Sequence, residues 1–262
     1  MWLILHGMTA DEPRPDPDLA SLFAPVAIEQ TVDGVLAEAA HVLREVVDPV
    51  DAELWGSDLI GALASSAAGP ASLADSLTGS LVPAAEAAST PEALALLRVF
   101  AVVGPPAVRS VAEQAAARLS AHGVEDPPWA GTLGSPRVGD CWRYADVGGR
   151  QESLTMTFAY GHRQHALCML IDHGRGGKIR DAWVVKAAEL RAETARAAGD
   201  DPLLLFEMID PADAVRRLQR AVSAGECPEQ PDQVDDVVAH RVLLHARLAL
   251  LVSAGTQPPA AP

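Results

Sequence analysis

Apolar residues recur at helical spacing through the first half of the chain. Residues 30–46 carry one apolar stripe, and residues 51–65 repeat its character. Apolar positions three and four residues apart are typical of amphipathic helices. Residues 66–89 have small side chains and a weak pattern, so both short helices and a mobile loop fit this segment.

Thr90-Pro91-Glu92 is the clearest local signal in this half of the chain. Threonine can cap a helix, proline suits the first helical position, and glutamate is favourable near the positive helix end. We therefore predict a helix over residues 91–103, which Gly104-Pro105-Pro106 ends. A second helix runs from there to about His122, where Gly123 is the C-cap. Together the two helices form a hairpin.

Beyond the rigid connector Glu125–Pro128, the apolar pattern changes to the period of two that is typical of strands. Leu154, Met156, Phe158 and Tyr160 share one face of such a strand. Residues 166–171 are apolar on both faces, which places them inside a sheet. The predicted strands cover residues 141–147, 154–160, 166–172 and 182–185, with glycine turns at 148–149, 161–162 and 176–177.

These strands predict an antiparallel β-meander over residues 137–186. The elements predicted after it are a helix near 186–199, a strand at 203–208, a helix that begins at Asp210-Pro211 and a helix over 232–253. The fold class is therefore α+β, with helical hairpins in the N-terminal half, a central meander and C-terminal helices. We predict a helical domain over residues 1–127 and an α+β domain over residues 128–262.

Charge narrows the possible partners. The formal net charge is −15, which disfavours nucleic acid and anionic membranes as partners. Residues 131–187 differ, since they hold five acidic and eight basic residues, and charge complementarity with the acidic flanks explains this basic segment. No run approaches the roughly 18 apolar residues of a membrane span. The three cysteines form no Cys-x-x-Cys pair, which fits a reducing cytoplasm.

The richest chemistry lies at the end of the third predicted strand. A carboxylate beside an imidazole can tune a general base, a glycine pair lets a ligand approach the backbone, and basic side chains can hold an anion. The candidate catalytic residues are Asp172, His173, Lys178 and Asp181. The candidate binding residues are Arg175, Gly176, Gly177 and Arg180. The alternative interpretation is a hairpin loop with solvated charges.

His162 and His165 are weak candidates for metal ligands. They could chelate together across a turn, but a third ligand would have to come from elsewhere. His165 and His173 are eight residues apart on an extended strand, beyond the reach of one ion at ~3.3 Å per residue. We therefore predict neither a metal nor a cofactor.

The same segment carries a resemblance. Tyr160-Gly161, His165–Cys168, Asp172-His173, Gly176-Gly177 and Asp181-Ala182-Trp183, with a looser match at Pro127–Ala130, resemble a stretch of uncharacterised actinobacterial proteins. The resemblance covers roughly residues 129–183. It implies a bacterial cytoplasm and brings no assigned activity.

Two functions fit these observations. The first is a cytoplasmic protein-interaction or regulatory module whose helical faces dock a protein partner. The alternative is a hydrolase-type enzyme that uses Asp172, His173 and Lys178, with or without a metal at His162 and His165. Whether the protein is an enzyme stays open at this point. A pocket lined by these side chains would favour the enzyme, and their dispersal on exposed loops would favour the module.

Overall fold

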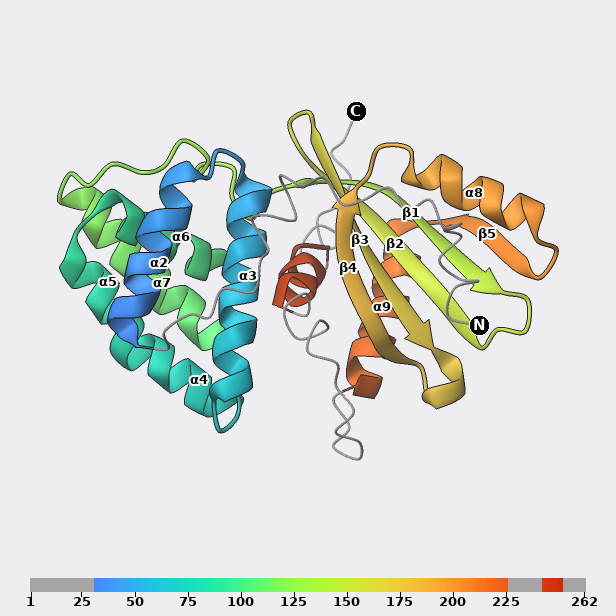
Figure 1. Ribbon diagram of the computed structural model, residues 1–262, viewed down its shortest axis with the longest axis horizontal. Helices are drawn as coiled ribbons and strands as arrows, with labels where there is room; N and C mark the ends of the chain where they lie inside the picture. Colours follow the sequence, from blue (N-terminus) through green and yellow to red (C-terminus); the bar gives the residue numbers. More distant parts are fainter. Residues whose placement is uncertain (1–30, 226–241, 252–262) are drawn as a thin grey trace, which may run out of the picture. The chain divides into compact units, whose positions relative to one another are not determined.

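The structure is a computed structural model that describes residues 31–225 and 242–251, and it divides into two compact units (Figure 1). Described residues 31–137 and 242–251 belong to a helical unit, and residues 138–225 belong to a sheet unit. Along the chain, the sheet unit is therefore inserted between two parts of the helical unit. The domain boundary expected at residues 127 and 128 stays a prediction.

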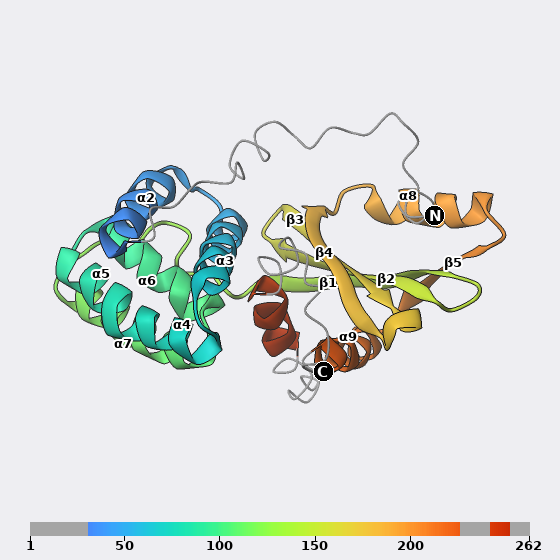
Figure 2. The same cartoon turned by 60° about the horizontal axis from the view of Figure 1, so that its bottom comes forward.

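The helical unit is built from short and medium helices (Figure 2). They are α2 (Val32–Glu45), α3 (Pro49–Ser66), α4 (Pro70–Ser76), the π-helical turn η1 (Leu77–Leu81), α5 (Val82–Ala88), α6 (Pro91–Val103) and α7 (Pro106–Ala121), and residues 242–251 are also helical. The weakly patterned segment 66–89 is therefore mostly helical. Its π turn lies just before Pro83, which has no N–H, and the N–H of Val82 bonds the carbonyl of Leu77.

Helix α6 is the centre of this unit, in contact with α2, α3, α5 and α7. Eight of its thirteen residues are buried, so apolar side chains cover most of its circumference. The hydroxyl of Thr90 accepts a hydrogen bond from the N–H of Ala93 at 3.2 Å, which confirms the predicted cap. The helix ends at Val103, as predicted, and α7 ends in a Schellman motif whose left-handed residue is Gly123 (φ +87°).

The sheet unit contains five antiparallel strands in the order β4-β3-β2-β1-β5. They are β1 (Arg137–Asp146), β2 (Gln151–Tyr160), β3 (Arg163–Asp172), β4 (Lys178–Lys186) and β5 (Leu204–Ile209). The first four form the meander expected over residues 137–186, and β3 is an interior strand, as predicted. The α+β fold class is confirmed.

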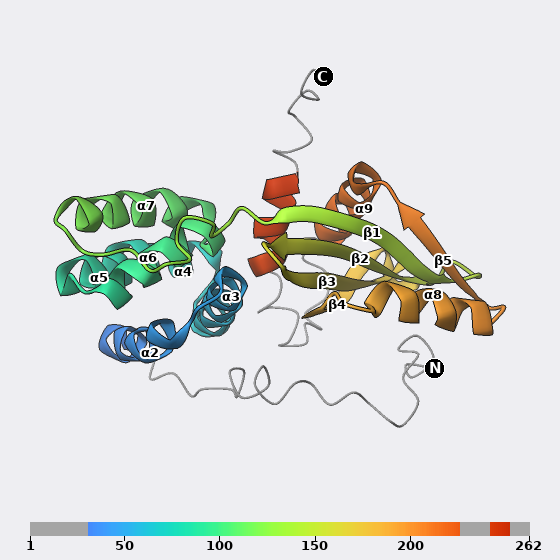
Figure 3. The ribbon, with the colours of Figure 1, turned by 90° about the horizontal axis from the view of Figure 1, so that it is seen from above.

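One helix lies over each face of the sheet, α8 (Leu190–Asp200) on one and α9 (Pro211–Gly225) on the other (Figure 3). On the α9 face, the register places Leu154 of β2 opposite Met169 of β3, and Met156 opposite Leu167. Helix α9 turns the buried side chains of Ala214, Leu218 and Ala221 inward. On the α8 face, Ala166 and Cys168 pack with Trp183 and Leu190.

Residues 242–251 of the last predicted helix are helical. The remainder of 232–253 lies outside the described residues. No helix in the described ranges is long and apolar enough to cross a membrane.

A buried ion pair joins the two parts of the helical unit that the sheet unit separates in sequence. Glu53 of α3 is 0% exposed and Arg247 is 1% exposed. The guanidinium donates to both carboxylate oxygens, with a distance of 3.1 Å from Nη1 to Oε1. Oε1 also accepts the N–H of Gly134 at 3.1 Å. Helix 242–251 is thereby bound to α3 across 194 residues of chain.

We expect Arg247→Leu to lower the free energy of unfolding by about 3–5 kcal/mol, because it leaves the carboxylate of Glu53 buried without its counter-ion. Adding Glu53→Met should recover much of this loss, since an apolar pair tolerates burial. Recovery is partial because the N–H of Gly134 loses this acceptor. Urea unfolding of both single variants and the double variant measures the coupling. Additive effects of the two substitutions would contradict a coupled pair.

Candidate functional site

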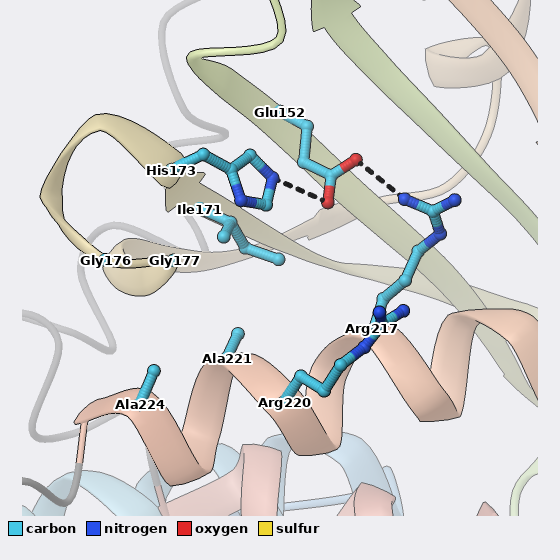
Figure 4. Close-up of a pocket in the computed structure, with 9 residues that line it drawn as sticks. All are labelled: Glu152, Ile171, His173, Gly176, Gly177, Arg217, Arg220, Ala221 and Ala224. Atoms are coloured by element: carbon cyan, nitrogen blue, oxygen red, sulfur yellow. Dashed lines mark hydrogen bonds and ion pairs between the residues drawn. The ribbon is translucent and has the colours of Figure 1, made fainter.

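A small cleft opens in the sheet unit between helix α9 and the open end of the β2–β3 hairpin, where β2 begins and β3 ends (Figure 4). Its volume is about 210 Å³. Strand residues, the loop after β3 and one side of α9 contribute its walls, which consist of Glu152, Ile171, His173, Gly176, Gly177, Arg217, Arg220, Ala221 and Ala224. All of them belong to one compact unit.

Glu152 is the hub of this cleft. It is only 3% exposed, although it is charged and lies on a strand. Its Oε1 lies 3.1 Å from Nε2 of His173, and its Oε2 accepts from Nη1 of Arg217 at 3.2 Å and from Nη1 of Arg143 at 3.5 Å. One buried carboxylate therefore connects β1, β2, the loop after β3 and α9. The cost of burying its charge is offset by these cationic and hydrogen-bonding partners.

The two arginines that hold Glu152 are themselves neutralised. Nε of Arg143 bonds Glu207 at 2.6 Å, and Nε of Arg217 bonds Asp213 at 3.0 Å. Burial alone would lower the pKa of Arg217, but Asp213, Glu152 and Glu207 outweigh it and raise that pKa. Both guanidinium groups are therefore fixed in place before any ligand arrives.

His173 has a defined tautomer in this arrangement. An ionised carboxylate only accepts hydrogen bonds, so Nε2 of His173 carries the proton that Glu152 accepts. Nδ1 then presents a lone pair, and a Cβ at Gly177 would lie 3.6 Å from it. Gly177 has φ +76° and no side chain, so the loop leaves Nδ1 accessible. The His173 side chain is 44% exposed. This geometry suits a histidine that takes a proton from a small molecule.

The structure brings His173, Gly176 and Gly177 of the predicted site into this cleft, but not the other members. His173 begins the 3₁₀ turn η2 (His173–Arg175), whereas Asp172 is the last residue of β3. Its carboxylate accepts from Nε2 of Gln151 at 3.5 Å. The expected Asp172–His173 pairing is therefore not present, and the carboxylate that contacts the imidazole is Glu152.

The remaining predicted residues lie beside the cleft or away from it. Arg175 is a 72% exposed side chain whose Nε lies 4.0 Å from Asp172. Lys178 stands opposite Asp172 in the β3–β4 ladder, and Asp181 stands opposite Leu170. Arg180 is the unpaired residue of the bulge between them. None of the four lines the cleft, and whether they take part in function stays a prediction.

Sequence reasoning missed Glu152, Arg217 and Arg220. A signal for Glu152 existed, because it occupies a position in the same alternating stripe as Leu154, Met156 and Phe158. A charge at a core-facing strand position needs a partner and so marks a site. Arg217 and Arg220 are three residues apart on α9, but their spacing alone does not reveal which strand they face.

The weak metal candidates do not converge. His162 is exposed in the β2–β3 turn, whereas His165 is 5% exposed. The His165 ring stacks on Phe158 at 5.6 Å and on Tyr160 at 6.3 Å between centroids. Within residues 31–225 and 242–251, no group of three or more His, Cys, Asp or Glu residues could hold a metal ion. The predicted absence of metal stays a prediction, which elemental analysis can check.

The described cysteines are poor nucleophiles. Burial raises the pKa of the Cys141 thiol to about 11 and that of Cys168 to about 12. Both thiols therefore stay protonated near neutral pH, and the thiolate is the reactive form. Neither cysteine lines the cleft.

We expect Glu152→Gln to lower the free energy of unfolding by about 1–3 kcal/mol, because the substitution removes the charge that His173 and two arginines contact. The control is Glu207→Gln, which alters an ion pair to Arg143 whose glutamate side chain is 56% exposed. Such a pair contributes less than about 1 kcal/mol. Urea unfolding compares the two variants. Equal losses would show that Glu152 is not the hub.

Comparison of the chain with models of known families, with curated proteins and with solved structures finds no match. The residues of the cleft therefore carry the functional argument.

Proposed function

We propose that the protein is a hydrolase-type enzyme in which His173 is the general base and Glu152 positions it. The observation that supports this is the hydrogen bond of 3.1 Å between Nε2 of His173 and the buried carboxylate of Glu152, in the wall of a cleft. The carboxylate sets the tautomer and orients the ring, and it stabilises the imidazolium that forms when Nδ1 accepts a proton.

The chemistry follows from these positions. Nδ1 of His173 takes a proton from a water molecule, whose oxygen attacks the electrophilic carbon or phosphorus of the substrate. Negative charge develops on the substrate oxygens, and the guanidinium group of Arg220 stabilises it. The bond to the leaving group then breaks, and the imidazolium returns its proton to that group. The net change adds water across the broken bond and restores neutral His173.

A panel of chromogenic carboxylic esters, amides, phosphate esters and glycosides tests this activity. We expect turnover of at least one class, and His173→Ala should reduce kcat/KM about 10²–10⁴-fold, the usual contribution of a general base. His162→Ala is the matched control, because it removes an exposed histidine from the β2–β3 turn, outside the cleft. Absence of turnover with every class, or equal activity of His173→Ala and wild type, would contradict the proposal.

A protein-interaction module is the second candidate, and the edge of the sheet favours it. Among the described residues, six large apolar side chains are exposed, and four of them lie at β5 or beside it: Val147 at 51%, Leu203 at 64%, Leu205 at 43% and Met208 at 45%. Edge strands present unpaired backbone groups, and natural proteins usually protect them with charge, proline or a bulge.

We propose that the partner at this edge is a second copy of the chain. Two β5 strands can pair antiparallel about a twofold axis, which is the commonest symmetry of homo-oligomers. The single charged residue within β5 is Glu207, and Arg143 of the same chain neutralises it at 2.6 Å. Electrostatic repulsion between the two paired strands would therefore be small. For either role we propose a cytoplasmic location, which the free, buried thiols of Cys141 and Cys168 support.

Sedimentation equilibrium tests the edge. Wild type should self-associate with rising concentration, and the double variant Leu205→Lys/Met208→Lys should stay monomeric, because lysine on an edge strand opposes pairing. Val111→Lys is the control, since it places the same charge at an exposed apolar position of α7 in the helical unit. A monomeric wild type at all concentrations would exclude self-pairing.

A further inference from the structure

We infer that the cleft binds the anionic group of its ligand, a carboxylate or a phosphate, through Arg220 of α9. This inference rests on the proposed function, since it names the substrate class of the same site. Its argument is separate, because it depends on charge and shape rather than on the imidazole.

The arginines around the cleft outnumber the carboxylates that pair with them by one. Four arginines, Arg143, Arg216, Arg217 and Arg220, face three carboxylates, Glu152, Glu207 and Asp213. Every carboxylate bonds at least one arginine, and Arg216 lies 3.3 Å from Asp213. Among the described residues, Arg220 has no carboxylate partner. The cluster therefore carries one uncompensated positive charge while His173 is neutral.

Arg220 is an exposed side chain that makes one hydrogen bond to the backbone. Its Nε donates to the carbonyl of Arg216 at 3.2 Å, one turn earlier on α9. This bond leaves both terminal nitrogens able to donate. Figure 4 shows Arg220 and Arg217 on the side of α9 that faces the strands. A planar guanidinium fork with no carboxylate partner in the described ranges suits the paired oxygens of a carboxylate or phosphate.

The net charge of the sheet unit does not oppose an anion at Arg220. The chain carries a net charge of −15. Residues 138–225 hold twelve acidic and twelve basic residues, so the sheet unit is neutral and the remaining sequence carries the whole excess. An anion is therefore not opposed by the unit that contains the cleft. Attraction to Arg220 is then local, and it weakens as salt screens it.

The shape of the cleft limits the rest of the ligand. Ile171, Ala221 and Ala224 contribute the apolar part of the lining. A volume of about 210 Å³ is below the roughly 300–1,000 Å³ of pockets that enclose a drug-sized molecule. The expected ligand is therefore a short acid with an apolar body, or the anionic end of a larger molecule.

Titration of the full-length protein with four butyl compounds tests the inference. The probes are butyrate, butyl phosphate, neutral butyramide and cationic butylammonium, and the readouts are the dissociation constant from calorimetry and the amide shifts of Gly176 and Gly177. We expect at least one of the two anions to bind, and binding to weaken with added salt. The neutral and cationic probes should bind at least about tenfold more weakly, because charge-assisted hydrogen bonds are lost. Preference between butyrate and butyl phosphate identifies the anionic group.

Arg220→Gln should weaken binding of the anion about tenfold or more, and Arg220→Lys should restore part of it by retaining the charge without the planar fork. Arg196→Gln is the matched control, because it removes an exposed arginine from α8, on the opposite face of the sheet. Circular dichroism confirms that each variant is folded. Binding that is equal in Arg220→Gln and Arg196→Gln, or equal for butyrate, butyl phosphate and butyramide, would overturn the inference, as would no binding of either anion at millimolar concentration.

The outcomes separate this inference from the proposed function. Anion binding that persists in His173→Ala, without turnover of any substrate by wild type, would remove the hydrolase and keep the anion site. Turnover that depends on His173 but proceeds on uncharged esters, with neither anion bound, would keep the hydrolase and remove the anion site.

Discussion

The buried carboxylate of Glu152 is the interaction on which the sheet unit and its cleft depend. A single charge that is 3% exposed must be compensated inside the fold, and the groups that compensate it come from β1, the loop after β3 and α9. This requirement orients the ring of His173 and fixes Arg217 against the strands. The same contacts that hold α9 over the sheet therefore shape the cleft, so stability and the proposed chemistry share one residue.

The helical unit also contains a buried carboxylate that pairs with an arginine, and this pair is more deeply buried. Glu53 and Arg247 are both almost completely buried, whereas the arginines around Glu152 keep about a quarter of their side chains exposed. A fully buried pair gains little net stability over an apolar pair, but it penalises any arrangement that separates its members. In this chain it binds the helix at 242–251 to α3, across the inserted sheet unit. The partly exposed arginines around Glu152 leave a place for a ligand, whereas the buried arginine beside Glu53 does not.

The two proposed roles use different parts of the sheet unit. The cleft lies at the end of the β2–β3 hairpin against α9, and the apolar edge lies at β5, beyond β1 in the strand order. Arg143 and Glu207 connect them, because this pair contacts Glu152 on one side and belongs to the edge strand on the other. If the enzyme dimerises through β5, Arg143 would therefore contact both Glu207 in the dimer interface and Glu152 in the cleft.

Local pattern was enough to predict most of the elements. Helix α6 with its Thr90 cap, the meander and the interior position of β3 all follow from periodicity, capping and turn residues, which act over a few positions. The sequence also suggested His173 and the glycine loop as candidates, but adjacency suggested Asp172 as the partner of His173. Only the tertiary structure decided that partner, because the pairing of β2 with β3 brings Glu152 beside the turn after β3 from 21 residues away. Arg247 reaches Glu53 for the same kind of reason: a buried charge selects its partner by position in space, which no short-range pattern encodes.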